Sequence, residues 1–225
     1  MPHTLLVLAG GTSPSPDALR ALPPAAMCIA ADSGLDHARV LGLIPDLLIG
    51  DLDSVSAESL AWAEREGVPI HRYPADKDQT DLELALSHAV ELEPARIVVA
   101  GIGGGRLDHF LANFMVLAQR RFAGPDIDGL IDGALISVVH RQRALSGRRG
   151  ELISLLPAHG DAVGVSTTGL RWPLHDETLR AGTSRGVSNL FADEAASVSL
   201  EHGTLLAIQP EYQLDPGSSA LDPSE

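Results

Sequence analysis

The sequence predicts an α/β protein with an N-terminal domain on a parallel sheet and a C-terminal domain of antiparallel strands. Short apolar runs alternate with amphipathic segments up to about residue 121, as in a parallel sheet with crossover helices. After that point glycine and proline are frequent, and apolar runs follow one another without convincing helices between them. The length of 225 residues accommodates two modest domains. We expect residues 1–128 to form the first domain, 129–213 the second, and 214–225 a tail rich in proline, glycine and serine.

Five strands and three helices are expected in the first domain. The strands are the apolar runs Thr4–Ala9, Met27–Ala31, Asp46–Ile49, Val68–Tyr73 and Arg96–Ala100. The helices are the amphipathic segments from about Ser56 to Glu66, from Thr80 to Val90 and from Leu107 to Leu117. The second helix opens with Thr80-Asp81-Leu82-Glu83, a capping box in which the threonine hydroxyl accepts from a backbone amide of the first turn.

The second domain is expected to contain five main strands and no prominent helix. These strands are the apolar runs Leu135–Val139, Glu151–Leu155, Ala162–Ser166, Ala196–Leu200 and Thr204–Ile208.

Charge and composition exclude several classes of protein. Lysine and arginine number 16 and aspartate and glutamate 30, which gives a net charge of −14 that would repel nucleic acid and anionic membranes. An anionic ligand would therefore need a metal ion or clustered cations. No apolar run is long enough to cross a bilayer, and Leu5–Ala9 is too short for a signal peptide. Because Cys28 is the single cysteine, no intrachain disulfide forms, and we expect a soluble cytoplasmic protein.

Acidic residues and glycines follow four of the expected strands. The segments are Asp32-Ser33-Gly34, Gly50-Asp51-Leu52-Asp53-Ser54, Asp76 to Asp81, and Gly103 to His109. Because the carboxyl ends of parallel strands meet at one edge of a sheet, we expect these segments to line one crevice.

Asp51 and Asp53 are candidates for binding a metal ion. In an extended segment their carboxylates point the same way, and two close carboxylates repel unless a cation lies between them. Oxygen ligands favour Mg²⁺, or alternatively Mn²⁺. The competing interpretation is a turn in which Asp53-Ser54 caps the next helix. Asp81 has a similar alternative, because the first position of a helix favours an anion whatever the function.

Lys77 and Arg106 are candidates for binding phosphate. Lys77 is the single lysine, since the other fifteen of the 16 basic residues are arginines, and it lies between two aspartates. A solvated surface lysine is the alternative. The segment from Gly101 to Arg106 matches neither the dinucleotide fingerprint nor a P-loop, but it presents backbone amides before a helix. His109 is adjacent to Asp108 and is expected to start that helix rather than to bind metal.

Two stretches of the second domain are unusual. Trp172 lies in a loop bounded by glycine and proline, and Ser188-Asn189 ends a segment that begins at Gly182. Aromatic residues make up only 4% of the chain. Trp172 is therefore either a core residue or a stacking platform for a flat ring, and composition leaves both open.

Together these segments resemble the thiamine pyrophosphokinase family. The matching pieces, in family order, are Ala31–Gly34, Pro45–Ser54, Asp76–Asp81, Gly105–His109, Thr168–Trp172 and Ser188-Asn189. Ser33 replaces the family's usual glycine, which bears on how closely a nucleotide approaches that turn, and Leu52 replaces a common phenylalanine.

The resemblance implies an α/β nucleotide-binding domain, a C-terminal β-sandwich, and a homodimer with thiamine between the α/β crevice of one chain and the β domain of the other. The implied reaction transfers the pyrophosphoryl group of ATP to the hydroxyl of thiamine. Residues implied to bind Mg²⁺ are Asp51, Asp53 and Asp81. Those implied to bind ATP are Asp32, Ser33, Gly34, Lys77, Asp78, Thr80, Gly105 and Arg106. Those implied to bind thiamine are Asp81, Trp172, Ser188 and Asn189.

Catalysis would rest on Lys77 and Arg106, with Asp81 or Asp108 accepting the hydroxyl proton. Two alternatives remain: the same transfer to another acceptor of the hydroxymethyl-pterin type, and a non-catalytic sensor of nucleotide or thiamine. The Trp172 and Ser188-Asn189 segments count against the first. The retained carboxylates and phosphate-binding cations count against the second.

Overall fold

The computed structural model describes residues 3–20, 22, 24–131 and 133–212. These residues divide into two compact units. Unit 1 contains the described residues up to Phe110 together with residues 130–131, and unit 2 contains Leu111–Gly129 and Gly133–Tyr212. The expected tail at 214–225 lies outside the described residues.

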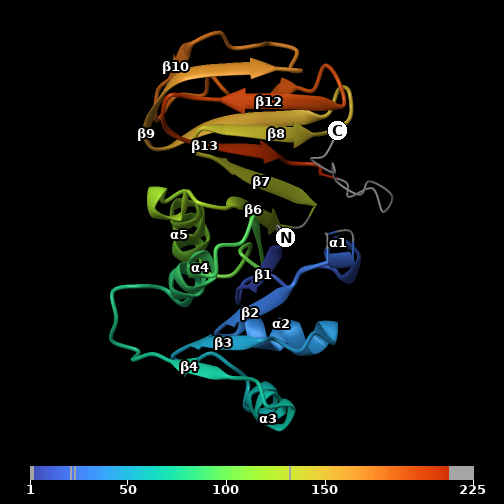
Figure 1. Cartoon of the computed structure of the whole chain (residues 1–225), viewed down its shortest axis with the longest axis vertical. Coiled ribbons are helices and arrows are strands. Elements are labelled where there is room, and N and C mark those ends of the chain that lie inside the picture. The colour runs from blue at the N-terminus through green and yellow to red at the C-terminus, as the bar shows by residue number, and fades with distance from the viewer. Residues whose placement is uncertain (1–2, 21, 23, 132, 213–225) are drawn as a thin grey trace. The chain divides into compact units, whose positions relative to one another are not determined.

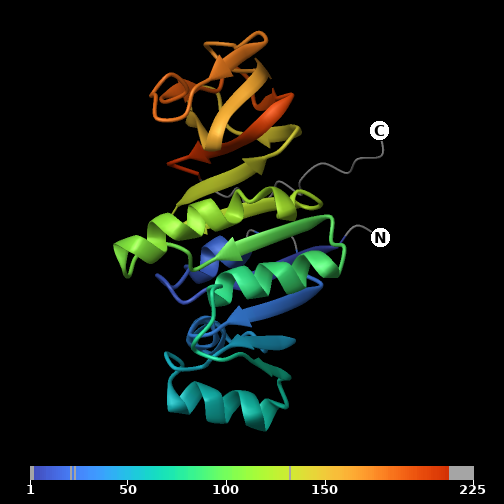
Figure 2. The ribbon, with the colours of Figure 1, turned by 90° about the vertical axis from the view of Figure 1, so that its left-hand side faces the viewer.

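Unit 1 is built on a parallel sheet with the strand order β4-β3-β2-β1-β5. Its strands are β1 (Thr4–Leu8), β2 (Met27–Ala31), β3 (Leu47–Gly50), β4 (Ile70–Arg72) and β5 (Arg96–Ala100). Its helices are α1 (Pro16–Arg20), α2 (Gly34–Leu41), α3 (Ala57–Glu66) and α4 (Asp81–Glu91). Figures 1 and 2 show β1 to β4 side by side. The predicted parallel α/β architecture is confirmed.

Helices cover both faces of this sheet, which explains why its strands other than β4 are buried and apolar at nearly every position. Figure 1 shows α4 on one side of β1 and β2, with α1 and α2 on the other. In the central strand β1, Leu5 to Leu8 are all buried. A strand that is buried on both faces is stabilised by apolar residues at every position rather than at alternate ones.

Unit 2 is dominated by antiparallel strands. They are β7 (Ala134–Val139), β8 (Gln142–Ser146), β9 (Leu152–Thr168), β10 (Glu177–Leu179), β11 (Asn189–Leu190), β12 (Ala195–Ser199) and β13 (His202–Gln209). The first half of β9 pairs with β13, which also pairs with β7, and the second half pairs with β12, which also pairs with β8. Side chains from both groups of strands form one apolar core, so the expected sandwich is confirmed.

One long strand, β9, replaces the two strands expected at Glu151–Leu155 and Ala162–Ser166. The chain bends at His159 and Gly160, whose φ angles are 60° and 131°, and its pairing with β13 shifts register there, between Ala158 and Val163. Gly160 therefore lies at an irregularity within one strand.

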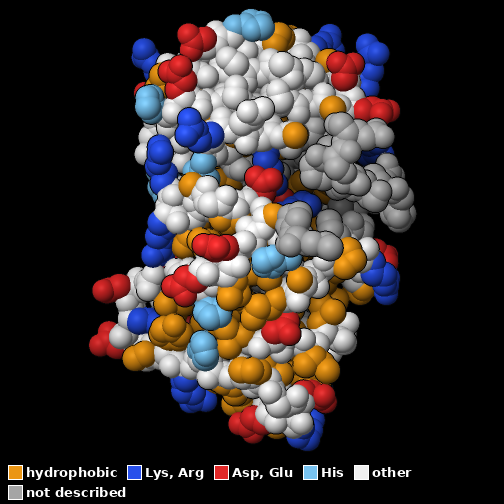
Figure 3. Space-filling model, viewed as in Figure 1, with side chains coloured by type: hydrophobic (Ala, Val, Ile, Leu, Met, Phe, Trp, Pro, Cys, Tyr) orange, Lys and Arg blue, Asp and Glu red, His pale blue; other side chains and the backbone are white. Residues whose placement is uncertain are grey.

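Helix α5 (Leu107–Leu117) and strand β6 (Asp126–Ile131) contribute residues to both units, and a short 3₁₀ helix, η1 (Arg120–Phe122), follows α5. No helix of the described residues is both long and apolar enough to cross a membrane. Acidic and basic side chains are interspersed on the face of the molecule shown in Figure 3.

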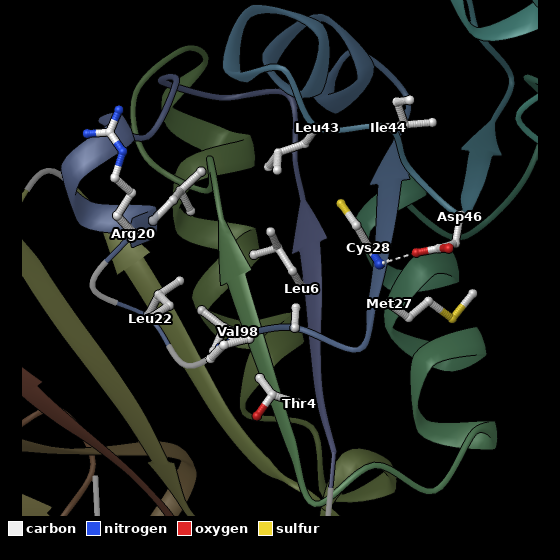
Figure 4. Close-up of a pocket in the computed structure, with 13 residues that line it drawn as sticks. Thr4, Leu6, Arg20, Leu22, Met27, Cys28, Leu43, Ile44, Asp46 and Val98 are labelled. Carbon is white, nitrogen blue, oxygen red and sulfur yellow. Dashed lines mark hydrogen bonds between the residues drawn. The ribbon is translucent and has the colours of Figure 1, made fainter. Parts of the chain in front are cut away.

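A cavity of about 410 Å³ lies in unit 1 where several strands begin (Figure 4). Thr4 and Met27 open β1 and β2, and Asp46 accepts a hydrogen bond from the Cys28 amide at 2.7 Å. Burial raises the pKa of the Cys28 thiol to about 12, so it stays neutral and is not a nucleophile. The acidic segments follow the opposite, carboxyl ends of the strands, and this cavity is therefore not the predicted site.

Candidate active site

Three carboxylates gather at the carboxyl ends of β2 and β3. One oxygen from each of Asp32, Asp51 and Asp53 lies within 4.8 Å of the others. The segment that carries Asp51 and Asp53 is not extended as expected, because Leu52 has a φ of 67°. The Leu52 side chain is buried in the apolar core of unit 1, so the chain turns to bury it and still leaves the two carboxylates together.

Asp32 shows that this cluster fits a cation. Its side chain is only 8% exposed. Asp32 Oδ2 accepts a hydrogen bond from the Ser54 hydroxyl, whereas Oδ1 is buried and has no hydrogen-bond partner among the described residues. A buried carboxylate oxygen without a partner is costly, and the cost increases beside two further carboxylates. An all-oxygen set of this kind suits Mg²⁺.

Lys77 connects this cluster to the start of α4. Its Nζ lies 2.6 Å from Asp51 Oδ2 and 3.2 Å from Asp81 Oδ1. The side chains of Lys77 and Asp51 are 14% and 13% exposed, so Lys77 is not the solvated surface residue of the alternative interpretation. The structure joins Asp81 to the cluster through Lys77, while Asp32 lies directly against Asp51 and Asp53.

The charges in the cluster shift the pKa values of its members. The hydrogen bond from Lys77 lowers the pKa of Asp51, and the negative charge of Asp51 raises the pKa of exposed Asp53. Burial raises the pKa of Asp81, and its contact with Lys77 only partly opposes that. Burial favours neutral Lys77, but its contacts with Asp51 and Asp81 outweigh burial and raise its pKa. Lys77 is therefore a permanent cation among the carboxylates.

Arg106 and Asp108 form a separate, exposed pair at the start of α5. Arg106 Nε and Nη2 donate to the two oxygens of Asp108 at 3.1 and 2.6 Å, and the His109 amide donates to Oδ1 at 3.0 Å. The hydrogen bonds from Arg106 hold the pKa of Asp108 at about 2. His109 lies in the first turn of α5, as expected.

The other residues assigned to ATP by resemblance lie in the loops and helix starts at the same end of the strands. Thr80 caps α4, where its hydroxyl accepts from the Glu83 amide at 3.3 Å, as the capping box predicts. Ser33 and Gly34 open α2, and the Ser33 side chain makes no capping hydrogen bond. Asp78 is exposed in the loop before α4, and Gly105 has a φ of 67° in the loop before α5.

Sequence reasoning missed the loop that follows β1. The Gly11 amide donates to the Gly101 carbonyl at 2.7 Å, and Thr12 donates to Gly103 at 2.6 Å. A Cβ at Gly11 would collide with those same carbonyls, so the close approach of the two loops requires glycine there. The glycine pair Gly10-Gly11 directly after the first strand could have indicated this loop, because it lies at the same sheet edge as the acidic segments.

Trp172 lies in unit 2 and is 52% exposed, so it is not a core residue. The Arg171 guanidinium lies over its ring, 5.0 Å from the centroid. Asn189 forms two hydrogen bonds with the Trp172 backbone. Ser188 precedes it with a φ of 62°, and its amide donates to Ser154 Oγ at 3.1 Å. The structure therefore gathers the three residues predicted to bind thiamine in this unit.

Two family models match the two halves of the chain. A model described as "Thiamin pyrophosphokinase, catalytic domain" matches residues 19–127. A second, described as "Thiamin pyrophosphokinase, vitamin B1 binding domain", matches residues 137–205.

Individual relatives agree with these matches. A thiamine pyrophosphokinase of Bacillus subtilis (strain 168) is 28% identical over 218 residues, which cover 92% of this chain and 98% of the relative. A crystal structure of the Bacillus subtilis enzyme matches with a TM-score of 0.80 at 27% identity, covering 93% of this chain and 99% of that one. Thiamin pyrophosphokinase from Candida albicans, at 15% identity and a TM-score of 0.78, shares the fold over 92% of this chain and 89% of its own. The chain belongs to the thiamine pyrophosphokinase family.

Proposed function

We propose that this protein transfers the pyrophosphoryl group of ATP to the hydroxyl of thiamine, forming thiamine diphosphate and AMP. The single observation that carries the proposal is the set of three carboxylates with Lys77 beside them, at the strand ends of unit 1. Phosphoryl-type transfer is catalysed mainly by positioning reactants and offsetting charge on phosphate oxygens. A metal site beside the largely buried Lys77 ammonium group can both position the reactants and offset the charge on the phosphate oxygens.

We place Mg²⁺ at Asp51 and Asp53 and add Asp32 to the ligand set. Asp32 contributes a buried oxygen that has no hydrogen-bond partner among the described residues and lies within 4.8 Å of oxygens of Asp51 and Asp53. Asp81, which the resemblance implies as a ligand, is held by Lys77 and supports the site from the start of α4. Bound Mg²⁺ would supply charge that offsets the negative phosphate oxygens of ATP.

Lys77 and Arg106 would contact the phosphates. Lys77 is already desolvated between Asp51 and Asp81, so it can bind a phosphate oxygen with little further loss of hydration. Arg106 is exposed and must exchange Asp108 for phosphate when ATP binds.

The reaction releases the thiamine hydroxyl proton, and Asp81 is the better placed of the two candidate bases to accept it. The thiamine hydroxyl oxygen bonds to the β-phosphorus, the bond from that phosphorus to the bridging oxygen of the α-phosphate breaks, and AMP leaves. The hydroxyl proton goes to a carboxylate. Burial raises the pKa of Asp81, which suits a proton acceptor, whereas the pKa of Asp108 is held at about 2 as long as Arg106 stays bound to it. We therefore assign proton transfer to Asp81.

Trp172 would bind thiamine by stacking. Its exposed indole presents a ring face that suits both a flat pyrimidine and a cationic thiazolium. From the family resemblance we further propose a homodimer in which thiamine binds between two chains. The lone cysteine supports a cytoplasmic location.

The test is a product assay with the purified protein, Mg²⁺ and ATP. We expect AMP and thiamine diphosphate in equal amounts when thiamine is present, and neither product without it. A hydroxymethyl-pterin replaces thiamine in a parallel reaction and should give no AMP. Formation of ADP, or AMP formation that requires the pterin, would refute the proposal. Light scattering at assay concentration tests the dimer.

A further inference from the structure

The segment that carries Trp172 leaves the backbone ladder at that residue. Leu170 forms an antiparallel bridge with Phe191, and the Arg171 amide donates to the Leu190 carbonyl at 2.9 Å. Continued in the same register, an antiparallel ladder would place Trp172 opposite Asn189 as a pair without backbone hydrogen bonds between them. Backbone atoms would not join this pair, and the Asn189 side chain supplies the hydrogen bonds to the Trp172 backbone instead.

The Asn189 carboxamide binds the Trp172 backbone at two points. Asn189 Oδ1 accepts from the Trp172 amide at 3.1 Å, and Nδ2 donates to the Trp172 carbonyl at 2.8 Å. Oδ1 also accepts from the Leu190 amide at 2.8 Å. A carboxamide has two acceptor lone pairs and two N–H donors. These three bonds use both lone pairs and one donor, which leaves a single N–H group for a ligand.

The backbone around Asn189 holds this side chain in place. Asn189 and Leu190 pair with Ile153 and Leu152 of β9. Ser188, immediately before them, adopts a left-handed φ of 62°, which is unfavourable for a residue with a Cβ and persists where the surroundings require it. Its amide is bound by Ser154 Oγ. The turn thus directs the Asn189 side chain toward the Trp172 backbone and not toward a ligand.

Trp172 needs such a support because little else fixes its ring. The side chain is half exposed, so core packing does not set its orientation. The contact with the Arg171 guanidinium comes from an exposed neighbour on the same loop. The direction of the Cα–Cβ bond of Trp172, and with it the position of the indole, therefore depends on the backbone that Asn189 holds.

We infer that Asn189 is a positioning residue that acts on thiamine binding through Trp172. By fixing the Trp172 backbone, Asn189 presets the indole for stacking and lowers the ordering cost of binding. The inference rests on the proposed function, and it replaces the direct contact with thiamine that the family resemblance implies for Asn189.

The experiment uses Trp172 as its own reporter. The chain has two tryptophans, so Trp62→Phe leaves Trp172 as the single tryptophan, which is excited selectively over the two tyrosines. Into this background we introduce Asn189→Ala, and Asn189→Asp as an isosteric variant that keeps the acceptor and loses the donor to the Trp172 carbonyl. The matched control, Thr183→Ala, removes a side-chain hydrogen bond to the Arg180 carbonyl in the same unit.

Fluorescence anisotropy and acrylamide quenching are first measured without ligand. Asn189→Ala should lower the anisotropy and increase the quenching, Asn189→Asp should fall between it and the parent, and the control should match the parent. With thiamine, Asn189→Ala should raise the Kd roughly three- to tenfold, the range for one or two hydrogen bonds. The kcat at saturating thiamine and the KM for ATP should not change.

A double-mutant cycle separates positioning from direct contact. In a Trp172→Ala background, Asn189→Ala should cause no further loss of thiamine affinity, because its effect requires the indole. An equal loss with and without the indole, or unchanged anisotropy in Asn189→Ala, would overturn the inference. Failure of the parent protein to bind thiamine would instead contradict the proposed function, and the ligand-free anisotropy distinguishes the two failures.

Discussion

Replacing Lys77 by methionine should separate a metal and phosphate site from a simple ion-pair cluster. The substitution keeps an unbranched apolar side chain and removes the charge. Lys77 Nζ lies 2.6 Å from Asp51 and 3.2 Å from Asp81, so its loss leaves two carboxylates without their cation. The two functional consequences have opposite signs: free Mg²⁺ should bind more tightly, and turnover should fall.

The magnitude follows from the two contacts. A pair of unit charges at 4 Å interacts by about 1 kcal/mol in water, so two pairs give about 2 kcal/mol at this solvent-screened limit. That energy corresponds to roughly thirtyfold in a binding constant. We therefore expect Mg²⁺ alone to bind Lys77→Met about five- to thirtyfold more tightly than the parent. Turnover should fall at least about tenfold, because a charge-assisted contact to phosphate is lost.

Calorimetric titration with MgCl₂ in the absence of nucleotide measures the first effect, and the AMP assay measures the second. Arg20→Met is the matched control, since it removes one positive charge from a side chain that is 74% exposed. The control should change neither quantity. If Lys77→Met leaves both Mg²⁺ affinity and turnover at control values, Lys77 is not part of the site. Weaker Mg²⁺ binding would show that Lys77 organises the carboxylates rather than competing with the metal.

Three other substitutions test separate parts of the account. Trp172→Ala should weaken thiamine binding about five- to hundredfold, the range for stacking and cation–π contacts, and spare both ATP binding and the melting temperature; an early melt with loss of both ligands would contradict it. Arg106→Gln should raise the pKa of Asp108 from about 2 toward 3.8, as measured by carboxyl-carbon NMR. The stability that this lowered pKa contributes is present above pH 3.8 and is lost as the pH falls toward 2, so the variant should be less stable than the parent above pH 3.8, and the difference should disappear in acid. Gly10→Ala places a methyl group against the Ser33 hydroxyl and should destabilise the protein by about 1–3 kcal/mol in denaturant titration, whereas adding Ser33→Gly should restore the lost stability; without rescue, the close contact is not the cause.

The sequence predicted the bounds of a strand well where the strand is buried on both faces, because such a strand is apolar along its length. Met27–Ala31 and Arg96–Ala100 match β2 and β5 to the residue, and Ser56 and Thr80 cap α3 and α4. The edge strand is shorter than expected: β4 covers only Ile70–Arg72, because it pairs with β3 alone. Helix α2 was missed because it is eight residues long and the Ser33 side chain does not cap it.

The composition of the candidate site was predictable, but the contacts within it were not. Acidic residues after parallel strands indicated one crevice, and the structure brings Asp32, Asp51 and Asp53 together. Which carboxylate pairs with Lys77 depends on the loop that crosses from β4 to α4, and periodicity does not encode its path. The left-handed turn at Leu52 was likewise hidden, because leucine gives no signal for it.

The most direct test of the central claim is the Mg²⁺ dependence of thiamine-dependent AMP formation in the parent, Asp53→Asn and Asp17→Asn. Asp53 is exposed, so its replacement should leave the fold intact, and a melting curve checks this. Asp17→Asn removes the same charge from a side chain that is 93% exposed in α1. We predict that Asp53→Asn is folded and inactive at Mg²⁺ concentrations that saturate the parent and the control. Near-normal activity of Asp53→Asn, with an unchanged Mg²⁺ dependence, would contradict the assignment of the carboxylate cluster as the metal centre.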